Sequence, residues 1–153
     1  MASEFLQRQK DDLIREVSAL GSLFFYILVI AVFFILGNRE MFVKLLAGLA
    51  IMYAITILLR TVYFKERPNR YNYNSYIEKL DAASFPSLHA SRAAFMGSVL
   101  INYFNSNLMS LVLVIVVLAI IYSRIPLKKH DWKDVSAGVV VGVLAYFAVG
   151  YVL

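Results

Sequence analysis

The residues best suited to chemistry lie in the segment SRIPLKKHDWKD, Ser123 to Asp134, between two strongly apolar stretches. His130 and Asp134 are four positions apart, so within a helical turn the carboxylate could accept a hydrogen bond from one imidazole nitrogen. The other nitrogen would then be directed elsewhere. Arg124 is expected at the end of the preceding apolar helix. The segment therefore offers a histidine, a carboxylate to orient it and a nearby cation.

A second polar group precedes the third apolar run. Arg60 and Arg67 are seven residues apart, so they would share one helix face if the helix continues past its apolar part. Pro68 is expected to end that helix. His89 follows Ser87 at the expected start of the next helix, where unpaired backbone N–H groups favour an anion. These residues add two cations, a hydroxyl and a second histidine.

Together the two groups suit phosphoryl transfer. Arginine matches phosphate oxygens with its planar fork, and stabilising the charge of the transferring group is the main task of such catalysts. A metal-dependent route would need more ligands than Asp131, Asp134 and the two histidines of the chain. We therefore expect no metal and no other cofactor.

The rest of the chain must hold these residues in a membrane. Its 153 residues are 61% hydrophobic, with a mean hydropathy of +0.71, whereas soluble domains are about 45–50% apolar. We predict an all-α, multi-pass bundle of about five spanning helices, forming a single membrane-embedded domain over residues 1–153. The expected spans are 19–37, about 41–59, about 88–104, 108–123 and 135–153, and the active-site segments are 60–92 and 123–134.

Residues 1–18 are charged and lack a cleavable signal pattern. Apolar residues recur among these charges at helical spacing, which favours an amphipathic helix lying in the membrane interface. A solvated leader is the alternative. The residues of the apolar face are Phe5, Leu6, Leu13, Ile14 and Val17.

Five crossings place the N-terminus, the segment after the second span and the segment after the fourth on one side of the membrane. The ionisable residues can therefore meet at one mouth of the bundle. The net charge of +5 follows the ends of the apolar runs rather than forming a basic stripe with interleaved aromatic residues, so nucleic acid is not expected as a partner. The expected partners are the bilayer and a lipid substrate, and the oligomeric state stays open.

Three short motifs make the chain resemble the type 2 phosphatidic acid phosphatase family, whose patterns read KxxxxxxRP, PSGH and SRxxxxxHxxxD. Here they occur in that order as RTVYFKERP (60–68), PSLH (86–89) and SRIPLKKHDWKD (123–134). The third pattern alone fixes four residues at set spacing, so a chance match is rare. The resemblance covers residues 60–134 by motif and the flanking helices by hydropathy.

The resemblance implies a division of roles among these residues. His130 would attack phosphorus and form a phosphohistidine, Asp134 would orient it, and His89 would act as general acid and base. The phosphate would be bound by Arg60, Arg67, Ser87 and Arg124, with the Leu88 backbone N–H as a further donor. Two residues depart from the family pattern: Arg60 stands where lysine is usual, and Leu88 stands where glycine is usual.

Two further features have competing interpretations. Arg92 lies one turn beyond His89 inside an apolar helix, where an arginine costs about 2.5–3.5 kcal/mol on insertion scales. It would pair with Asp131 or Asp134, support the phosphate, or merely snorkel to the interface. Gly138 and Gly142 permit close helix packing, with a dimer interface as the alternative.

The sequence thus predicts a metal-independent phosphatase acting on a membrane lipid phosphate or lipid pyrophosphate. Phosphatidic acid, phosphatidylglycerophosphate, polyprenyl pyrophosphate and a glycolipid phosphate all remain candidates. The alternatives are a phosphotransferase that uses a lipid or sugar hydroxyl as acceptor, and a non-catalytic phospholipid-binding membrane protein. Basic residues concentrate on the motif side, which favours a cytoplasmic site by the positive-inside rule, whereas the family resemblance favours an extracytoplasmic one, which we expect.

Overall fold

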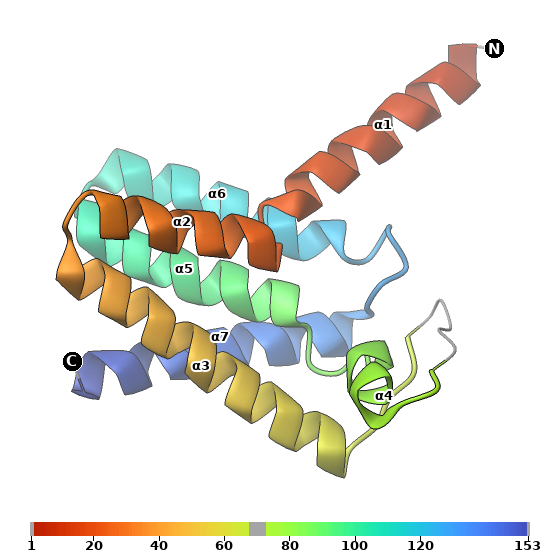
Figure 1. Cartoon of the computed structure of the whole chain (residues 1–153). Helices are drawn as coiled ribbons and strands as arrows, with labels where there is room; N and C mark the ends of the chain where they lie inside the picture. The colour runs from red at the N-terminus through yellow and green to blue at the C-terminus, as the bar shows by residue number, and fades with distance from the viewer. Residues whose placement is uncertain (1, 68–72, 153) are drawn as a thin grey trace.

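The computed structural model describes residues 2–67 and 73–152, and the regular structure of that part of the chain is seven helices (Figure 1). Pro68, the expected helix terminator, lies outside the described residues. The all-α prediction is confirmed. The helices are α1 Ala2–Ala19, α2 Leu23–Ile35, α3 Arg39–Val62, α4 Tyr76–Ala82, α5 Leu88–Phe104, α6 Asn107–Ser123 and α7 Trp132–Val152.

Helix α5 lies at the centre of the bundle and packs against α2, α3, α6 and α7. Small residues let the other helices approach it closely. A Cβ on Gly138 would lie less than 3.0 Å from the carbonyl oxygen of Ser87, the N-cap of α5, and a Cβ on Gly142 would lie equally close to the Ser91 carbonyl oxygen. Both distances are shorter than those of real Cβ contacts. The two glycines therefore serve helix packing within the chain, as the first interpretation predicted.

All five apolar segments predicted to span the membrane are helical. Two helices, α3 and α7, are long and apolar enough to cross a bilayer, and α1 with α2 forms a third, bent candidate. Helices α5 and α6 have 17 residues each, or about 26 Å, a little less than the hydrocarbon thickness of about 30 Å. Large apolar side chains on α2, α6 and α7 face outward, including Phe24, Ile35, Leu118 and Phe147, as lipid contact requires.

The N-terminal segment is helical, as predicted, but the helix within the apolar run 19–37 begins at Leu23 rather than at residue 19. Helix α1 ends at Ala19, and the axis bends by 45° before α2 begins at Leu23. The Ser22 hydroxyl accepts from the Phe25 N–H and so caps α2. Figure 1 shows α1 extending away from the bundle, and its Phe5 and Leu13 side chains are exposed.

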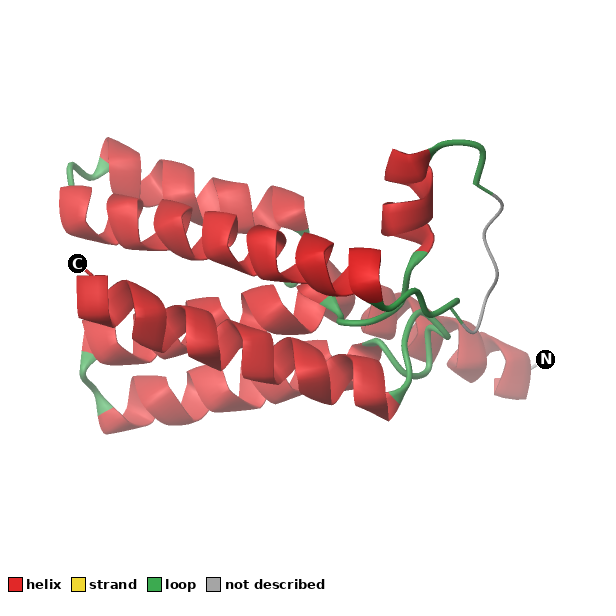
Figure 2. Cartoon of the chain, turned by 90° about the horizontal axis from the view of Figure 1, so that it is seen from below, coloured by secondary structure: helices red, strands yellow, loops and turns green. Residues whose placement is uncertain are grey.

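The polar connections gather at one end of the bundle. The described parts of the loops on either side of α4 and the loop between α6 and α7 lie at this end together with α1, whereas the two tight turns and the C-terminal end of α7 lie at the other (Figures 1 and 2). The predicted convergence of the two motif-bearing segments is thus present in the fold. We call this the motif end.

Candidate active site

The motif end contains a cavity of about 480 Å³ whose wall is largely cationic. Every one of the three sequence motifs contributes to it. Of the residues singled out in the sequence, Ser87 and Asp134 do not line this cavity and lie fully buried behind it. The lining residues are Leu23, Tyr53, Arg60, Arg67, Asp81, Leu88, His89, Arg92, Arg124, Lys129 and His130.

Arg60 and Arg67 reach the cavity from different kinds of backbone. Arg60 is in the last turn of α3, but α3 ends at Val62, so the expectation of a shared helix face is wrong. The chain after it is held extended because the Lys65 carbonyl accepts from the Ser84 N–H and Glu66 pairs with Ala83. This pairing consumes backbone groups that a longer helix would need.

Carbonyl groups around α4 orient these two guanidiniums. Arg60 donates to the Leu80 carbonyl at 2.7 Å and to the Pro86 carbonyl at 3.1 Å, and Arg67 donates to the Asp81 carbonyl. The two acceptors of Arg60 are neutral, so these bonds fix the position of its positive charge without cancelling it. The Nε of Arg60 is buried and has no hydrogen-bond partner among the described residues.

Arg124 also lines the cavity. It is the C-cap of α6, where the sequence placed it, and it is 6% exposed. Its Nη1 donates to the hydroxyl of Ser18, near the end of α1. Its carbonyl accepts from the backbone N–H groups of Lys129 and His130 at 3.3 and 3.4 Å. One residue thus connects the leader helix with the loop that carries His130.

The beginning of α7 fixes Asp134 in place. Asp131 and Asp134 form a reciprocal pair, in which each carboxylate accepts from the other's backbone N–H at 3.0 Å. This arrangement has the form of a capping box. His130 precedes the helix, so the expected pairing of His130 with Asp134 across one helical turn is replaced by a loop-to-helix approach.

His130 approaches Asp134 but does not bond to it. Its Nδ1 lies 3.8 Å from the Asp134 Oδ2, and that buried nitrogen has no hydrogen-bond partner among the described residues. A shift of about 1 Å would close the bond, and catalytic hydrogen bonds are often long before substrate binds. Burial lowers the pKa of His130, with a smaller opposing effect from Asp134 and further lowering by Arg124 and Arg67. The imidazole is therefore neutral at neutral pH.

Lys65 is a residue of the site that sequence reasoning did not single out. Its Nζ lies 2.6 Å from Asp131 Oδ2 and 2.7 Å from Asp134 Oδ1, joining the first motif to the third. Burial opposes the charge of Lys65, but the bonds to the two aspartates outweigh it and raise its pKa. Burial likewise opposes the charge of Asp131, yet the bond from Lys65 lowers its pKa overall. Two carboxylates at one end of a membrane bundle need a cation nearby, but the spacing of the residues did not identify Lys65 as that cation.

The second motif forms the N-terminus of α5. His89 is half-buried in the first turn and Leu88 precedes it, and both line the cavity. The Ser87 N–H donates to the Asp134 carbonyl at 3.0 Å, joining the second motif to the third. The Ser87 hydroxyl is fully buried, caps nothing and has no partner among the described residues.

Arg92 lies behind His89 and not beside the carboxylates. Its Nε donates to the Gly21 carbonyl at 3.1 Å, its Nη1 to the Tyr53 hydroxyl at 3.1 Å, and its Nη2 lies 3.3 Å from His89 Nδ1. The proposed pairing with Asp131 or Asp134 is wrong because Lys65 occupies both. Snorkelling is also excluded, since the residue is 4% exposed. Tyr53 and Gly21 are apolar-segment residues that carried no sequence signal.

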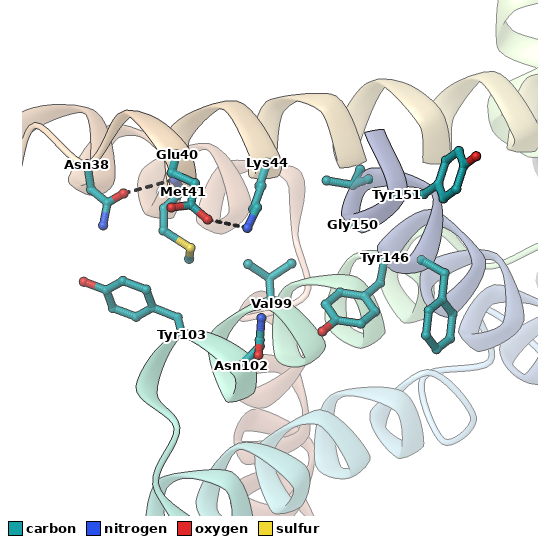
Figure 3. A pocket seen from close by; sticks show the side chains of 12 residues that line it. Asn38, Glu40, Met41, Lys44, Val99, Asn102, Tyr103, Tyr146, Gly150 and Tyr151 are labelled. Atoms are coloured by element: carbon teal, nitrogen blue, oxygen red, sulfur yellow. Dashed lines mark hydrogen bonds and ion pairs between the residues drawn. The ribbon is translucent and has the colours of Figure 1, made fainter. Parts of the chain in front are cut away.

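A larger cavity, of about 700 Å³, lies at the opposite end of the bundle (Figure 3). Its wall combines Asn38, Asn102 and several tyrosines with Lys44, whose Nζ pairs with Glu40. No histidine or arginine lines it within the described part of the chain. Size alone would select this cavity, but the reactive groups are at the motif end.

The described residues hold no group of three or more histidine, aspartate or glutamate side chains arranged to bind a metal ion. Asp131 and Asp134 are bonded to Lys65 and to backbone N–H groups. The ligand set at this site thus suits direct arginine contact to an anion better than metal coordination.

Comparison with known proteins gives a family and two similar folds. The family model of the PAP2 superfamily matches residues 41–153. The crystal structure of LpxE from Aquifex aeolicus superposes with a TM-score of 0.75 at 20% identity, covering 94% of this chain and 86% of that one. A PAP2-type phosphatidylglycerolphosphate phosphatase from Bacillus subtilis gives 0.66 at 21% identity, covering 94% and 76%.

The family match includes all three motifs, because residues 60–134 lie within the matched range. Each of the two solved structures covers 94% of this chain, so the similarity of fold extends into the residues that precede the family match. The chain therefore belongs to the PAP2 superfamily, as an integral-membrane phosphatase.

Proposed function

We propose that this phosphatase removes the terminal phosphate of a membrane lipid phosphate or lipid pyrophosphate through a phosphohistidine on His130, without a metal ion. The observation that carries the proposal is the convergence of His130, His89 and the arginines of the first and third motifs on one cavity. Such a wall binds a phosphate dianion and places a nucleophile beside it.

His130 is the nucleophile in this mechanism. Burial keeps its imidazole neutral, and a neutral nitrogen can attack phosphorus directly. With Nδ1 turned to Asp134, Nε2 is left for attack. The phosphorylated ring carries a positive charge, which Asp134 stabilises once the present 3.8 Å separation closes.

Lys65 positions this carboxylate, and the arginines bind the phosphate. Arg60, Arg67 and Arg124 neutralise the equatorial oxygens as the phosphoryl group transfers. The Leu88 N–H at the beginning of α5 adds a donor, and the buried hydroxyl of Ser87 can support that turn. His89 stands at the leaving oxygen.

The substrate is a lipid because the cavity is at one end of a bundle with an apolar exterior. The bilayer would hold the apolar tail while the phosphate enters between the helix ends at headgroup level. We place this site on the extracytoplasmic face. Part of the positive charge counted at the motif end belongs to buried residues, Arg60, Arg92 and Arg124, which weakens the topological argument for the opposite orientation.

The test is phosphate release by the purified protein in detergent with a chelator present. The substrates are phosphatidic acid, phosphatidylglycerophosphate, a polyprenyl pyrophosphate and a glycolipid phosphate. Release that disappears in His130→Ala supports the proposal. An acid-labile phosphoryl group found on His130 by mass spectrometry, and missing in that variant, identifies the intermediate.

Two results would overturn this function. Equal release by His130→Ala would mean a different nucleophile, and release that needs an added lipid or sugar alcohol would indicate a phosphotransferase. The orientation of the site in the membrane needs a separate test. The chain has no cysteine, so one introduced cysteine can be labelled specifically. A single cysteine at Lys79 should react with a membrane-impermeant thiol reagent in intact cells, and reaction only after permeabilisation would place the site in the cytoplasm.

A further inference from the structure

Arg92 is held by three anchors that leave it little freedom. Each of its nitrogen atoms has a separate partner: the Gly21 carbonyl, the Tyr53 hydroxyl and His89 Nδ1. These partners come from the α1–α2 bend, the middle of α3 and the first turn of α5. Arg92 is 4% exposed, so its contact with His89 is part of the packed structure.

This contact fixes where His89 carries its proton. A guanidinium has donors only, so the atom that faces it must be an acceptor. Nδ1 of His89 therefore presents its lone pair to Arg92. A neutral imidazole with a lone pair on Nδ1 has its single proton on Nε2, and the doubly protonated ring would place an N–H against the guanidinium. His89 lines the cavity, and the hydrogen-bond donor of its ring is then a neutral Nε2–H.

A neutral Nε2–H can donate a hydrogen bond but is a poor acid, because losing that proton would leave an imidazolate. Leaving groups differ in what they need from it. An alkoxide from a phosphomonoester is strongly basic and must receive a proton as it departs. A phosphate leaving from a pyrophosphate is stable as an anion, so a hydrogen bond is sufficient.

We propose that Arg92 makes this site selective for lipid pyrophosphates over lipid phosphomonoesters by holding His89 as a neutral hydrogen-bond donor. The inference rests on the proposed function, because it specifies the substrate class of the same site. Arg92 is a positioning residue in this scheme, since it acts on the substrate through His89.

The atoms and charges balance without an acid. In the first step His130 Nε2 bonds to the terminal phosphorus, the bond from that phosphorus to the bridging oxygen breaks, and the lipid monophosphate leaves with a hydrogen bond from His89. In the second step water bonds to phosphorus and the N–P bond breaks. The nitrogen keeps the electron pair, and both protons of the water remain on the released inorganic phosphate.

Matched substrates test the selectivity. Hexadecyl pyrophosphate and hexadecyl phosphate have the same saturated tail and differ in the leaving group. We expect kcat/KM for the pyrophosphate to exceed that for the monophosphate by about 100-fold or more, the usual contribution of general acid catalysis. Equal values in the wild-type protein would overturn the inference while leaving the phosphatase function intact.

Variants then assign the selectivity to Arg92. In Arg92→Met the Nδ1 of His89 is free to take a proton, so the pyrophosphate-to-monophosphate ratio should fall about tenfold or more, most strongly in acidic buffer. Arg92→Lys retains a donor and should keep most of the ratio. Equal losses on both substrates in Arg92→Met would show a structural role, and a raised KM for both with an unchanged ratio would show phosphate binding.

A measurement without an Arg92 variant guards against misfolding. The chain has two histidines, so His130→Ala leaves one. In that protein, labelled with ¹⁵N-histidine, we expect NMR shifts of a neutral ring with the proton on Nε2, unchanged from neutral pH into mildly acidic buffer. A proton on Nδ1, or a doubly protonated ring at neutral pH, would overturn the inference. Absence of His130-dependent phosphate release from every substrate would instead contradict the proposed function.

Discussion

The two ends of the bundle each contain a cavity, and the smaller one contains the chemistry. At the motif end, about 480 Å³ are surrounded by arginines and histidines. At the opposite end, about 700 Å³ are surrounded by tyrosines, amides and the Glu40–Lys44 pair. Arg60 is bonded to neutral carbonyl groups, so its charge remains available to an anion, whereas that of Lys44 is already balanced. Charge without a counter-ion indicates function better than volume does.

The largest difference between the two ends should appear when one residue is removed from each. His130→Ala should reduce kcat/KM for phosphate release about 10⁴-fold or more, because the nucleophile is lost. Lys44→Ala removes an ion pair between residues four apart, worth about 0.3–0.5 kcal/mol, and should leave kcat/KM within about twofold. Steady-state assays in detergent measure both. Comparable losses would contradict the assignment of the site to the motif end.

Removing the cation that joins the first and third motifs should have the next largest effect. Lys65→Met leaves the fully buried carboxylate of Asp134 without its charged partner, and a displacement of about 1 Å can cost about 100-fold in rate. Lys79→Met is the matched control, since Lys79 lies over the Phe64 ring at 5.2 Å and outside the cavity wall. Turnover of the Lys65 variant at the level of the control would show that Asp134 needs no such support.

A smaller effect should distinguish the packing of the two ends. Gly138→Ala places a Cβ against the Ser87 carbonyl at the motif end, and overpacking of this kind costs about 1–3 kcal/mol. Gly150→Ala, in the wall of the other cavity, has nothing within 4 Å and should be neutral or slightly stabilising. Thermal unfolding in detergent compares the two. A lower unfolding midpoint for the Gly150 variant than for the Gly138 variant would contradict the close packing of α7 against α5 at Gly138.

The smallest expected effect concerns pH. Burial lowers the pKa of His130, and the nucleophile is active when neutral, so activity should persist as the pH falls and be lost only below the ordinary histidine pKa of about 6.5. Arg124→Gln removes one of the charges that lower this pKa and should move the acid limb of kcat/KM upward by about half a unit. A wild-type limb above pH 6.5 would mean that His130 is not the group titrating.

Local features of the sequence correctly predicted the helices and the family. Apolar runs of sufficient length form helices wherever the fold places them, and the fixed spacing in SRIPLKKHDWKD is a local property. Arg124 therefore lies at a helix end and His89 in a first helical turn, as predicted. The 45° break before α2 lies a few residues after the predicted boundary between the N-terminal helix and the first span, at Gly21 and the N-cap residue Ser22.

Contacts between distant segments were not predictable in this way. The shared face of Arg60 and Arg67 failed because residues 65 and 66 pair with residues 83 and 84, and the helix therefore stops. The predicted carboxylate partners of Arg92 were wrong. Whether Arg92 bonds to Asp131, Tyr53 or the Gly21 carbonyl depends on which helices pack against it.

The sequence by itself determined an all-helical membrane chain, the order of three motifs and the residue types needed to transfer a phosphoryl group. Only the tertiary structure decided that Lys65 binds both aspartates and that Arg92 faces Nδ1 of His89. The physical reason is that hydropathy and spacing act along the chain, whereas the partner of a buried charge is chosen by distances of a few ångströms between helices that the sequence separates by tens of residues.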